Sequence, residues 1–269
     1  MDARPIGVFD SGVGGLTVLH ECLVSLPGED FIYLGDHARL PYGPRPLQEI
    51  SRFAHEIAAY LAALDVKLIV VACNTATSAS LPALQSTFAV PVIGVIAPGA
   101  SAAVRATRNR RIGLLATEAT VRAGRYQALV TALDAGVRFT AVACPKLVPL
   151  IESGAQTVEA VSEVAAPLRV AGADTVILGC THYPFIRPVF ERVFGREVTL
   201  VFSAEETARE VAETLARKGF ANRPDREGTT RFLTTGDPES FRALGERLLQ
   251  LPLPGVNRVS VAELEAAAA

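Results

Sequence analysis

The sequence predicts an α/β fold made of two pseudo-symmetric domains, each a parallel sheet with helices on both faces, that face each other across a cleft. Two observations lead to this prediction. Strand-like aliphatic runs alternate with helical patterns along the chain, and the order of these segments repeats. Near-continuous aliphatic strands separated by helices are typical of parallel sheets that are buried on both faces.

In the first part of the chain, four aliphatic runs are expected to form strands, at 5–10, 30–35, 66–73 and 91–96. Each is short and rich in Val, Ile, Leu or Phe, as buried strands are. Between the second and third runs, "LQEISRFAHEIAAYLAALD" (47–65) spaces its apolar residues as an amphipathic helix does.

The second part of the chain shows the same alternation. Strand-like runs occur at 111–117, 137–144, 173–180 and 197–203, and "TVEAVSEVAAPLRVAG" (157–172) has helical patterning. These segments predict a second parallel sheet with helical connections.

The two parts also correspond in sequence. "IGVFDSGVGGLTV" is echoed by "IGLLATEATV" at an offset of 106 residues, and Cys73 and Cys180 are 107 residues apart in the echoing runs "VKLIVVACNT" and "ADTVILGCTH". "PVIGVIAPGA" is answered by "EVTLVFSAEE" at a similar offset. Three correspondences in one register predict two homologous α/β halves.

A tail from about residue 208 has no counterpart in the second part. It contains a helical segment, a short strand "RFLTT" (231–235) and a second helix, "PESFRALGERLLQ". We expect this tail to pack on the first domain. The predicted domains are therefore 1–96 together with 208–269, and 97–207.

Composition and charge exclude several classes of protein. Hydrophobic residues make up 49% of the 269 residues, a fraction typical of a globular protein. The net charge is −2, so the charge does not indicate binding to nucleic acid or to an anionic membrane. The N-terminus has no apolar signal-peptide core, and no apolar run is long enough to span a bilayer. We expect a cytoplasmic protein whose four cysteines are reduced.

Cys73 and Cys180 occupy matching positions, each at the end of a strand-like run. Ligands bind outside the carboxyl ends of strands in open parallel sheets, so two facing sheets bring these thiols to one cleft. A helix N-terminus after such a strand favours a thiolate. A buried, purely structural cysteine is the alternative for each, and it is our interpretation of Cys22 and Cys144. Zinc-type Cys and His spacings are absent, so no metal is expected.

Other candidate residues carry an alternative as well. Asp10, in the turn "DSGVGG", is either an acid–base partner or a turn and N-cap acid. Tyr42 and Gly43, in "LPYGPR", either contact a ligand or form a rigid turn bounded by prolines. Of the four histidines, only His182, two residues after Cys180, is well placed for chemistry.

Two opposed thiols suit inversion of configuration at a carbon acid, because one group removes a proton from one face and the other supplies a proton to the opposite face. Such a reaction also needs donors for carboxylate groups. Neutral donors at corresponding strand ends are Ser11, Asn74, Thr75, Thr117, Thr120 and Thr181.

The motifs "FDSGVGGLTV", "PYG", "ACNTAT", "CPKLVPLIE", "GCTHYP" and "TTGDPESF", in this order over nearly the whole chain, closely resemble glutamate racemase. The resemblance implies a cofactor-independent isomerase that interconverts L- and D-glutamate for peptidoglycan synthesis, hence for cell-wall biogenesis and cell shape. It implies no cofactor, and we expect glutamate as the small-molecule partner and a homodimer.

The resemblance also implies roles for individual residues. Cys73 would take the α-proton of D-glutamate and Cys180 that of L-glutamate. Asp10 would assist Cys73, His182 would assist Cys180, and Glu152 would lie on the Cys180 side. The substrate would be held by Asp10, Ser11, Tyr42, Gly43, Asn74, Thr75, Thr117, Thr120, Thr181 and His182.

The chain departs from the family pattern at two positions: Ala116 stands where glycine is usual, and Phe202 where an aspartate often precedes "SAEETA". Because the chain begins almost at its first motif, we expect no activation by a cell-wall nucleotide precursor. The alternatives are a racemase acting on aspartate or a hydantoin and a non-enzymatic amino-acid-binding module. A pyridoxal-phosphate racemase is disfavoured, because no lysine lies in a recognisable phosphate site.

Overall fold

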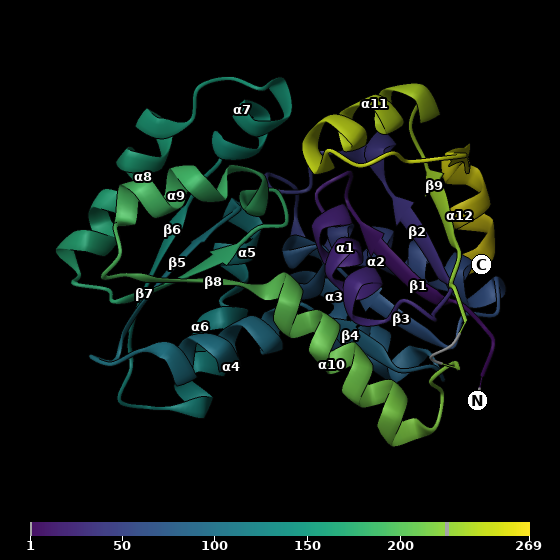
Figure 1. Ribbon diagram of the computed structural model, residues 1–269, viewed down its shortest axis with the longest axis horizontal. Coiled ribbons are helices and arrows are strands. Elements are labelled where there is room, and N and C mark those ends of the chain that lie inside the picture. Colours follow the sequence, from purple (N-terminus) through teal and green to yellow (C-terminus); the bar gives the residue numbers. More distant parts are fainter. Residues whose placement is uncertain (1, 224–225) are drawn as a thin grey trace.

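The computed structural model describes residues 2–223 and 226–269 and places their strands in two separate sheets (Figure 1). Every pair of neighbouring strands in these sheets is parallel. The predicted α/β fold with two parallel-sheet units is therefore confirmed. We call the two units the six-stranded half and the four-stranded half.

The six-stranded half has a completely buried strand near its centre, Ile6–Asp10, with neighbours on both sides. Across the sheet, in spatial order, the strands are β10 (Asn257–Arg258), β9 (Thr230–Thr234), β2 (Phe31–Gly35), β1 (Ile6–Asp10), β3 (Leu68–Val71) and β4 (Val92–Gly94). The four-stranded half has β6 (Arg138–Ala143), β5 (Arg111–Ala116), β7 (Thr175–Gly179) and β8 (Thr199–Phe202).

Helices cover both faces of each sheet, and two apolar clusters in each half lie between helices and sheet (Figure 1). On the six-stranded half they are α1 (Leu16–Ser25), η1 (His37–Arg39), α2 (Leu47–Ala63), α3 (Asn74–Thr87), α10 (Ser203–Lys218), α11 (Pro238–Leu249) and α12 (Val261–Ala268). On the four-stranded half they are α4 (Ile96–Ala106), α5 (Glu118–Ala123), α6 (Arg125–Leu133), α7 (Leu147–Ser153), α8 (Val158–Val170), η2 (Tyr183–Ile186) and α9 (Arg187–Phe194).

The pattern that predicts a helix over 47–65 corresponds to α2. Its apolar residues Ile50, Phe53, Ile57 and Leu61 are three or four positions apart and all buried. At this spacing they form one stripe, which packs in the core beneath the six-stranded sheet.

The C-terminal part of the chain completes the six-stranded sheet. β9 pairs with β2 over its whole length, and β10 adds the outermost strand beside it. α10 packs on α1 and also touches α4 of the four-stranded half. It begins at Ser203, a few residues earlier than the helical part of the tail was expected.

Two elements of the tail were not predicted. β10 consists of only two exposed residues, so it has no hydrophobic pattern from which a strand could be predicted. α12 begins with a capping box, in which the Ser260 hydroxyl accepts from the Glu263 N–H and the Glu263 carboxylate accepts from the Ser260 N–H. The spacing Ser-x-x-Glu was therefore the signal for this helix.

The carboxyl ends of the central strands position the site. β1 and β3 of one sheet, and β5 and β7 of the other, end next to Ser11, Cys73, Thr117 and Cys180, which all line one cavity. Because parallel strands end at one edge of a sheet, two facing edges enclose this space.

Candidate active site

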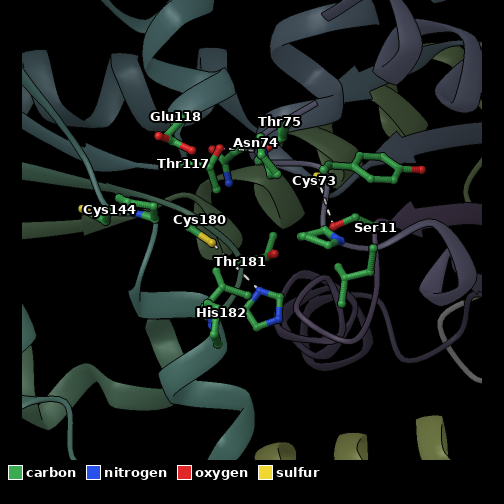
Figure 2. Close-up of a pocket in the computed structure, with 18 of the residues that line it drawn as sticks. Ser11, Cys73, Asn74, Thr75, Thr117, Glu118, Cys144, Cys180, Thr181 and His182 are labelled. Carbon is green, nitrogen blue, oxygen red and sulfur yellow. Dashed lines mark hydrogen bonds between the residues drawn. The ribbon is translucent and has the colours of Figure 1, made fainter. Parts of the chain in front are cut away.

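A cavity of about 370 Å³ is lined by residues from both halves of the molecule. Cys73 and Cys180 both line it, and Figure 2 shows them on different sides of the pocket. The lining residues are Ser11, Leu40, Pro41, Tyr42, Gly43, Pro44, Cys73, Asn74, Thr75, Thr117, Glu118, Cys144, Pro145, Val148, Pro149, Glu152, Cys180, Thr181 and His182.

Cys73 is the N-cap residue of α3. Its Sγ accepts a hydrogen bond from the Ala76 N–H at 3.4 Å, and its thiol lies 3.7 Å from the Ser11 Oγ. Burial raises the pKa of Cys73 well above its ordinary value, and the nearby Asp10 carboxylate raises it further. The hydrogen bonds with Ala76 and Ser11 offset only part of this shift. Cys73 is therefore a thiol at neutral pH.

Asp10 lies at the end of β1, fully buried behind the cavity wall rather than on it. Its carboxylate accepts a hydrogen bond from the Gly12 N–H at 3.1 Å and another from the Thr181 hydroxyl at 3.4 Å. The first contact is that of a turn acid, which was the alternative interpretation of this residue. The second joins Asp10 to the strand end that carries Cys180.

The glycines of "DSGVGG" allow the two halves to approach closely. A Cβ on Gly14 would overlap the Thr181 Oγ1 and lie 2.5 Å from the His182 Nδ1. One on Gly15 would lie 2.5 Å from the Asp10 Cβ. The glycines of this turn therefore allow protein segments to pack closely at the site. The turn does not act as a phosphate-binding loop.

Cys180, His182 and Glu152 form a row on the four-stranded half. The His182 Nδ1 lies 3.9 Å from the Cys180 Sγ, and its Nε2 lies 2.8 Å from a Glu152 carboxylate oxygen (Figure 2 shows the first contact). His182 is only 2% exposed, and this burial by itself lowers its pKa. Hydrogen bonds to Cys180 and Glu152 outweigh the burial and raise the pKa of His182 to about 10. The imidazole is therefore protonated at neutral pH.

Glu152 completes this row as the anionic partner of His182. Burial by itself raises the pKa of Glu152, but the hydrogen bond and charge of His182 outweigh it and, with His37 and Arg247, lower the pKa below its ordinary value. Glu152 is thus a carboxylate at neutral pH, and it holds the imidazolium of His182 beside the Cys180 sulfur.

Three threonine hydroxyls meet where the two halves touch. The Oγ1 atoms of Thr75 and Thr117 are 2.8 Å apart, those of Thr117 and Thr120 are 2.9 Å apart, and that of Thr120 is 3.3 Å from Thr75. Thr75 and Thr117 line the cavity, whereas Thr120 is buried behind them. Hydroxyls can reorient, so this cluster can turn protons toward a bound carboxylate.

Asn74 lines the cavity with a side-chain amide whose oxygen already has a hydrogen-bond partner. Its Oδ1 accepts from the Tyr126 hydroxyl at 2.6 Å, which fixes the orientation of the side chain. Its buried Nδ2 has no hydrogen-bond partner among the described residues. A buried amide N–H without a partner is costly, so a ligand acceptor in this cavity would satisfy it.

The loop that carries Tyr42 and Gly43 forms another wall. The Tyr42 hydroxyl donates to Asp36 and not to the cavity, so the tyrosine presents its ring to the cavity. The Gly43 carbonyl accepts from the Ala119 N–H at 3.1 Å, which attaches this loop to the four-stranded half.

The structure adds lining residues that the sequence did not indicate. Cys144 was interpreted as structural, but it lines the cavity beside Pro145, and burial raises its pKa to about 12. Its strand-end position was the available signal, the same as for Cys180. The additional lining residues are Leu40, Pro41, Pro44, Glu118, Cys144, Pro145, Val148 and Pro149.

Neither departure from the family pattern lines the cavity. Ala116 is a buried residue at the end of β5, and its carbonyl accepts from the Cys144 N–H at 2.8 Å. Phe202 lies under the guanidinium of Arg187, 5.0 Å from it. The missing aspartate at position 202 is thus replaced by a cation–π contact outside the cavity.

The charges of the site are unusual for a pocket that would hold an acidic ligand. No lysine or arginine is among the lining residues, and the side chains that bear charge there are Glu118, Glu152 and His182. Recognition of carboxylates would therefore depend on hydroxyls, amides and the N-terminus of α3. Among residues 2–223 and 226–269, no group of three or more His, Cys, Asp or Glu side chains is arranged to hold a metal ion. Nor does any helix there have the length and hydrophobicity needed to cross a membrane.

Comparison with known proteins gives consistent matches. The family model described as Asp/Glu/Hydantoin racemase matches residues 11–211. A glutamate racemase of Geobacter metallireducens is 46% identical over 266 residues, which is 97% of this chain and 98% of that protein.

Solved structures give the same result. Glutamate racemase isoform RacE1 from Bacillus anthracis superposes with a TM-score of 0.93 at 40% identity, covering 97% of this chain and 99% of that one. Glutamate racemase from Francisella tularensis, solved in complex with D-glutamate, has a TM-score of 0.91 at 32% identity, covering 99% of this chain and all of that one.

Proposed function

Because the chain belongs to the Asp/Glu/hydantoin racemase family, and within it to the glutamate racemases, we propose that it interconverts L- and D-glutamate by means of two cysteines. One observation carries the mechanism: Cys73 and Cys180, from different sheets, line one cavity from different sides (Figure 2). A reaction that inverts a carbon centre needs an acid–base group on each face of the carbon.

The reaction proceeds by transfer of two different protons. The thiolate on one side removes the α-proton of glutamate and becomes a thiol. The thiol on the opposite side gives its proton to the carbanion and becomes a thiolate. The C–H bond that forms lies on the face opposite the one that broke, so the configuration is inverted. The reverse reaction exchanges the roles of the sulfurs.

The groups beside the two sulfurs differ. The imidazolium of His182, paired with Glu152, lies 3.9 Å from the Cys180 sulfur. Cys73 has the Asp10 carboxylate near it and remains a thiol. The two sulfurs therefore have different proton partners, which suits a pair that exchanges the roles of base and acid.

Neutral donors hold the substrate. The unpaired Nδ2 of Asn74, the hydroxyls of Ser11, Thr75, Thr117 and Thr181, and the N-terminus of α3 all face the cavity or border it. The complex of the Francisella tularensis relative with D-glutamate supports glutamate as the ligand of this site.

Three wider proposals follow from the family. The D-glutamate serves peptidoglycan synthesis, the enzyme works in the cytoplasm, and it is a homodimer. Rescue of a D-glutamate auxotroph by the intact chain, but not by Cys73→Ala, tests the first. Subcellular fractionation tests the second, and light scattering on the purified chain tests the third.

The decisive experiment is incubation of the purified protein with L-glutamate in deuterated water without additives. We expect the α-proton NMR signal to disappear while the optical rotation decays to zero. L-aspartate and a hydantoin serve as competing substrates, and the Cys73→Ala and Cys180→Ala variants serve as controls. Exchange with aspartate or hydantoin but not with glutamate would assign the chain to a different racemase activity. Binding of glutamate without exchange would indicate an amino-acid-binding module.

A further inference from the structure

The two halves of the molecule touch behind the cavity, where a residue that does not line it, Arg247, contacts the backbone of a lining residue, Glu152. Arg247, on α11 of the six-stranded half, donates a hydrogen bond from its Nη2 to the backbone carbonyl of Glu152. Glu152 is near the C-terminal end of α7, and Figure 1 shows α7 above the four-stranded half and α11 above the six-stranded half. The guanidinium therefore reaches across the cleft to the backbone of the residue that holds His182.

This contact has a simple physical basis. The last carbonyls of a helix have no partner within the helix and carry partial negative charge, so a cation there is favourable. α7 ends at Gly154, whose left-handed backbone (φ of 74°) turns the chain away and leaves room for the Arg247 side chain. A Cβ on Gly154 would lie 3.3 Å from the Arg247 Nη1.

Two contacts therefore fix the position of Glu152, one at its backbone and one at its carboxylate. Its backbone carbonyl is held by Arg247, and its carboxylate accepts from the His182 imidazole at 2.8 Å. The groups that face the carboxylate electrostatically are His182 from the loop after β7, His37 from η1 and Arg247 from α11. Two of these three groups, His37 and Arg247, belong to the six-stranded half.

We propose that Arg247 is a positioning residue that couples the closed arrangement of the two halves to the His182–Glu152 pair. When the halves are together, Arg247 holds the end of α7 so that Glu152 reaches His182, and His182 in turn sits beside the Cys180 sulfur. When they separate, Arg247 leaves α7, Glu152 loses its support, and the acid–base group of one face is no longer assembled. This inference rests on the proposed function, in which Cys180 and His182 act on glutamate.

The first test compares Arg247→Gln, Arg247→Lys and the matched control Arg242→Gln in steady-state racemisation. Arg242 is on the same helix, but its ion pairs are with Glu239 and Glu246 within α11. Arg247→Gln should lower kcat by roughly 2- to 30-fold, the range typical of residues that couple two sites. KM should change much less, because Arg247 does not line the cavity. Arg247→Lys keeps a charged donor and should restore most of the rate, and Arg242→Gln should behave as wild type.

The second test needs no substrate. The titration of His182 is followed by NMR on the protein labelled at histidine, with His182→Asn to assign the signal among the four histidines. If Glu152 shifts away in Arg247→Gln, His182 loses its anionic partner and its pKa falls. If Arg247 acted only through its charge, its removal would instead raise the pKa of His182. A fall in Arg247→Gln, and no change in Arg242→Gln, is the expected result.

The outcomes separate the two proposals. A His182 pKa in Arg247→Gln that is unchanged or raised overturns the positioning role, as does a kcat loss equal to that of Arg242→Gln. If the wild-type chain failed to racemise glutamate while the His182 pKa still fell in Arg247→Gln, the positioning contact would stand and the proposed function would fail. Circular dichroism and melting temperature confirm that each variant is folded.

Discussion

Cys73 and Cys180 are alike in position but differ in the charge beside each sulfur. Cys73 caps a helix and has a buried carboxylate, Asp10, nearby, which opposes a thiolate. Cys180 has an imidazolium beside it, held by Glu152. Opposite charges next to two chemically identical groups allow one to start as base and the other as acid, without any difference between the cysteines themselves.

Removal of either thiol is expected to stop the reaction in both directions, because in the proposed mechanism each turnover uses both sulfurs. Cys73→Ala and Cys180→Ala should each lose at least about 10²- to 10⁴-fold in rate, the scale of a positioned acid–base group. Chiral chromatography from pure L- and pure D-glutamate measures both directions. Near-wild-type turnover by either variant would rule out the two-cysteine mechanism.

Loss of the neighbouring groups should have unequal effects on the two directions. His182→Asn and Asp10→Asn are expected to reduce the rate by tens- to thousands-fold, as lost acid–base assistance does. If each residue assists a different sulfur, as the family resemblance implies, the primary deuterium isotope effects in the L-to-D and D-to-L directions should change by different amounts. The equilibrium ratio must remain that of wild type. Rates and isotope effects like those of wild type in both variants would make these side chains structural.

The raised pKa of His182 also makes folding stability depend on pH. The folded state holds the proton up to a pKa of about 10, whereas the ordinary value is 6.5. The contribution to the free energy of unfolding is therefore complete below pH 6.5, falls as the pH rises from 6.5 to 10, and is absent above that range. Urea unfolding at pH 6, 8 and 10 should show a difference between wild type and His182→Asn that shrinks with rising pH. A difference that grew over this range would mean that His182 is neutral in the folded protein.

At the scale of elements, strand ends and the turns after them make the site. The predicted strands are present because runs such as 173–180 are rich in aliphatic residues, and a cysteine at the end of such a run, as Cys180 is after β7, must fall at a sheet edge. For this reason the sequence could indicate Cys73 and Cys180. The lining role of Val148 and Pro149 could not be predicted, because it depends on how α7 is tilted over its sheet, and no local pattern encodes that.

The same limit explains the other differences. Asp10 is at the predicted strand end, but the direction of its side chain is decided by the Gly12 N–H and Thr181, one local contact and one across the cleft. Cys144 satisfied the strand-end rule as well as Cys180 did, but it lacked both a neighbouring histidine and a matching cysteine in the other half of the repeat. Its lining position is a property of the assembled sheet order, in which β6 lies beside β5.

The glycine-rich turn gives a sharp test at this scale. Gly14→Ala should force Thr181 and His182 away from the turn and reduce activity by at least about tenfold, since small displacements of catalytic groups are costly. Gly12→Ala is the matched control in the same turn, where an added Cβ would find its nearest neighbour, Leu40, at an ordinary 3.4 Å. Equal activity in the two variants would show that the close approach at Gly14 is not required.

At the scale of the whole molecule, the cavity belongs to neither half alone. Contacts from Thr17 to the Thr181 carbonyl (3.0 Å), from Ala119 to Gly43, and from Arg247 to Glu152 cross between the halves around it. We propose that the predicted domains, 1–96 with 208–269, and 97–207, move as two bodies about these contacts, with the second boundary moved to the start of α10 at Ser203 so that this helix stays whole. Opening would admit the substrate, and closing would bring the two cysteines to opposite faces of it.

Binding of D-glutamate should therefore slow amide hydrogen exchange in both halves. We expect protection in the turn after β1 and at the start of α3, and also after β5 and β7. Hydrogen exchange measured by mass spectrometry with and without D-glutamate, with Cys73→Ala to prevent turnover, locates the protected peptides. Protection limited to one half would contradict a shared site.

The position of β9 in the six-stranded sheet has a consequence for how the protein is made. β2 pairs with a strand that the ribosome supplies about two hundred residues later, while the segments of the four-stranded sheet are synthesised in one uninterrupted stretch between them. During translation the four-stranded half can finish folding first, although it is not the N-terminal one. The strands β1 to β4 are synthesised earlier, but their sheet is complete only after β9 and β10 have been synthesised. Arg247 is also among these late residues. A nascent chain thus carries both thiols and every lining residue of the cavity before β9 and Arg247 are made, and we expect catalysis only once these late segments support the site.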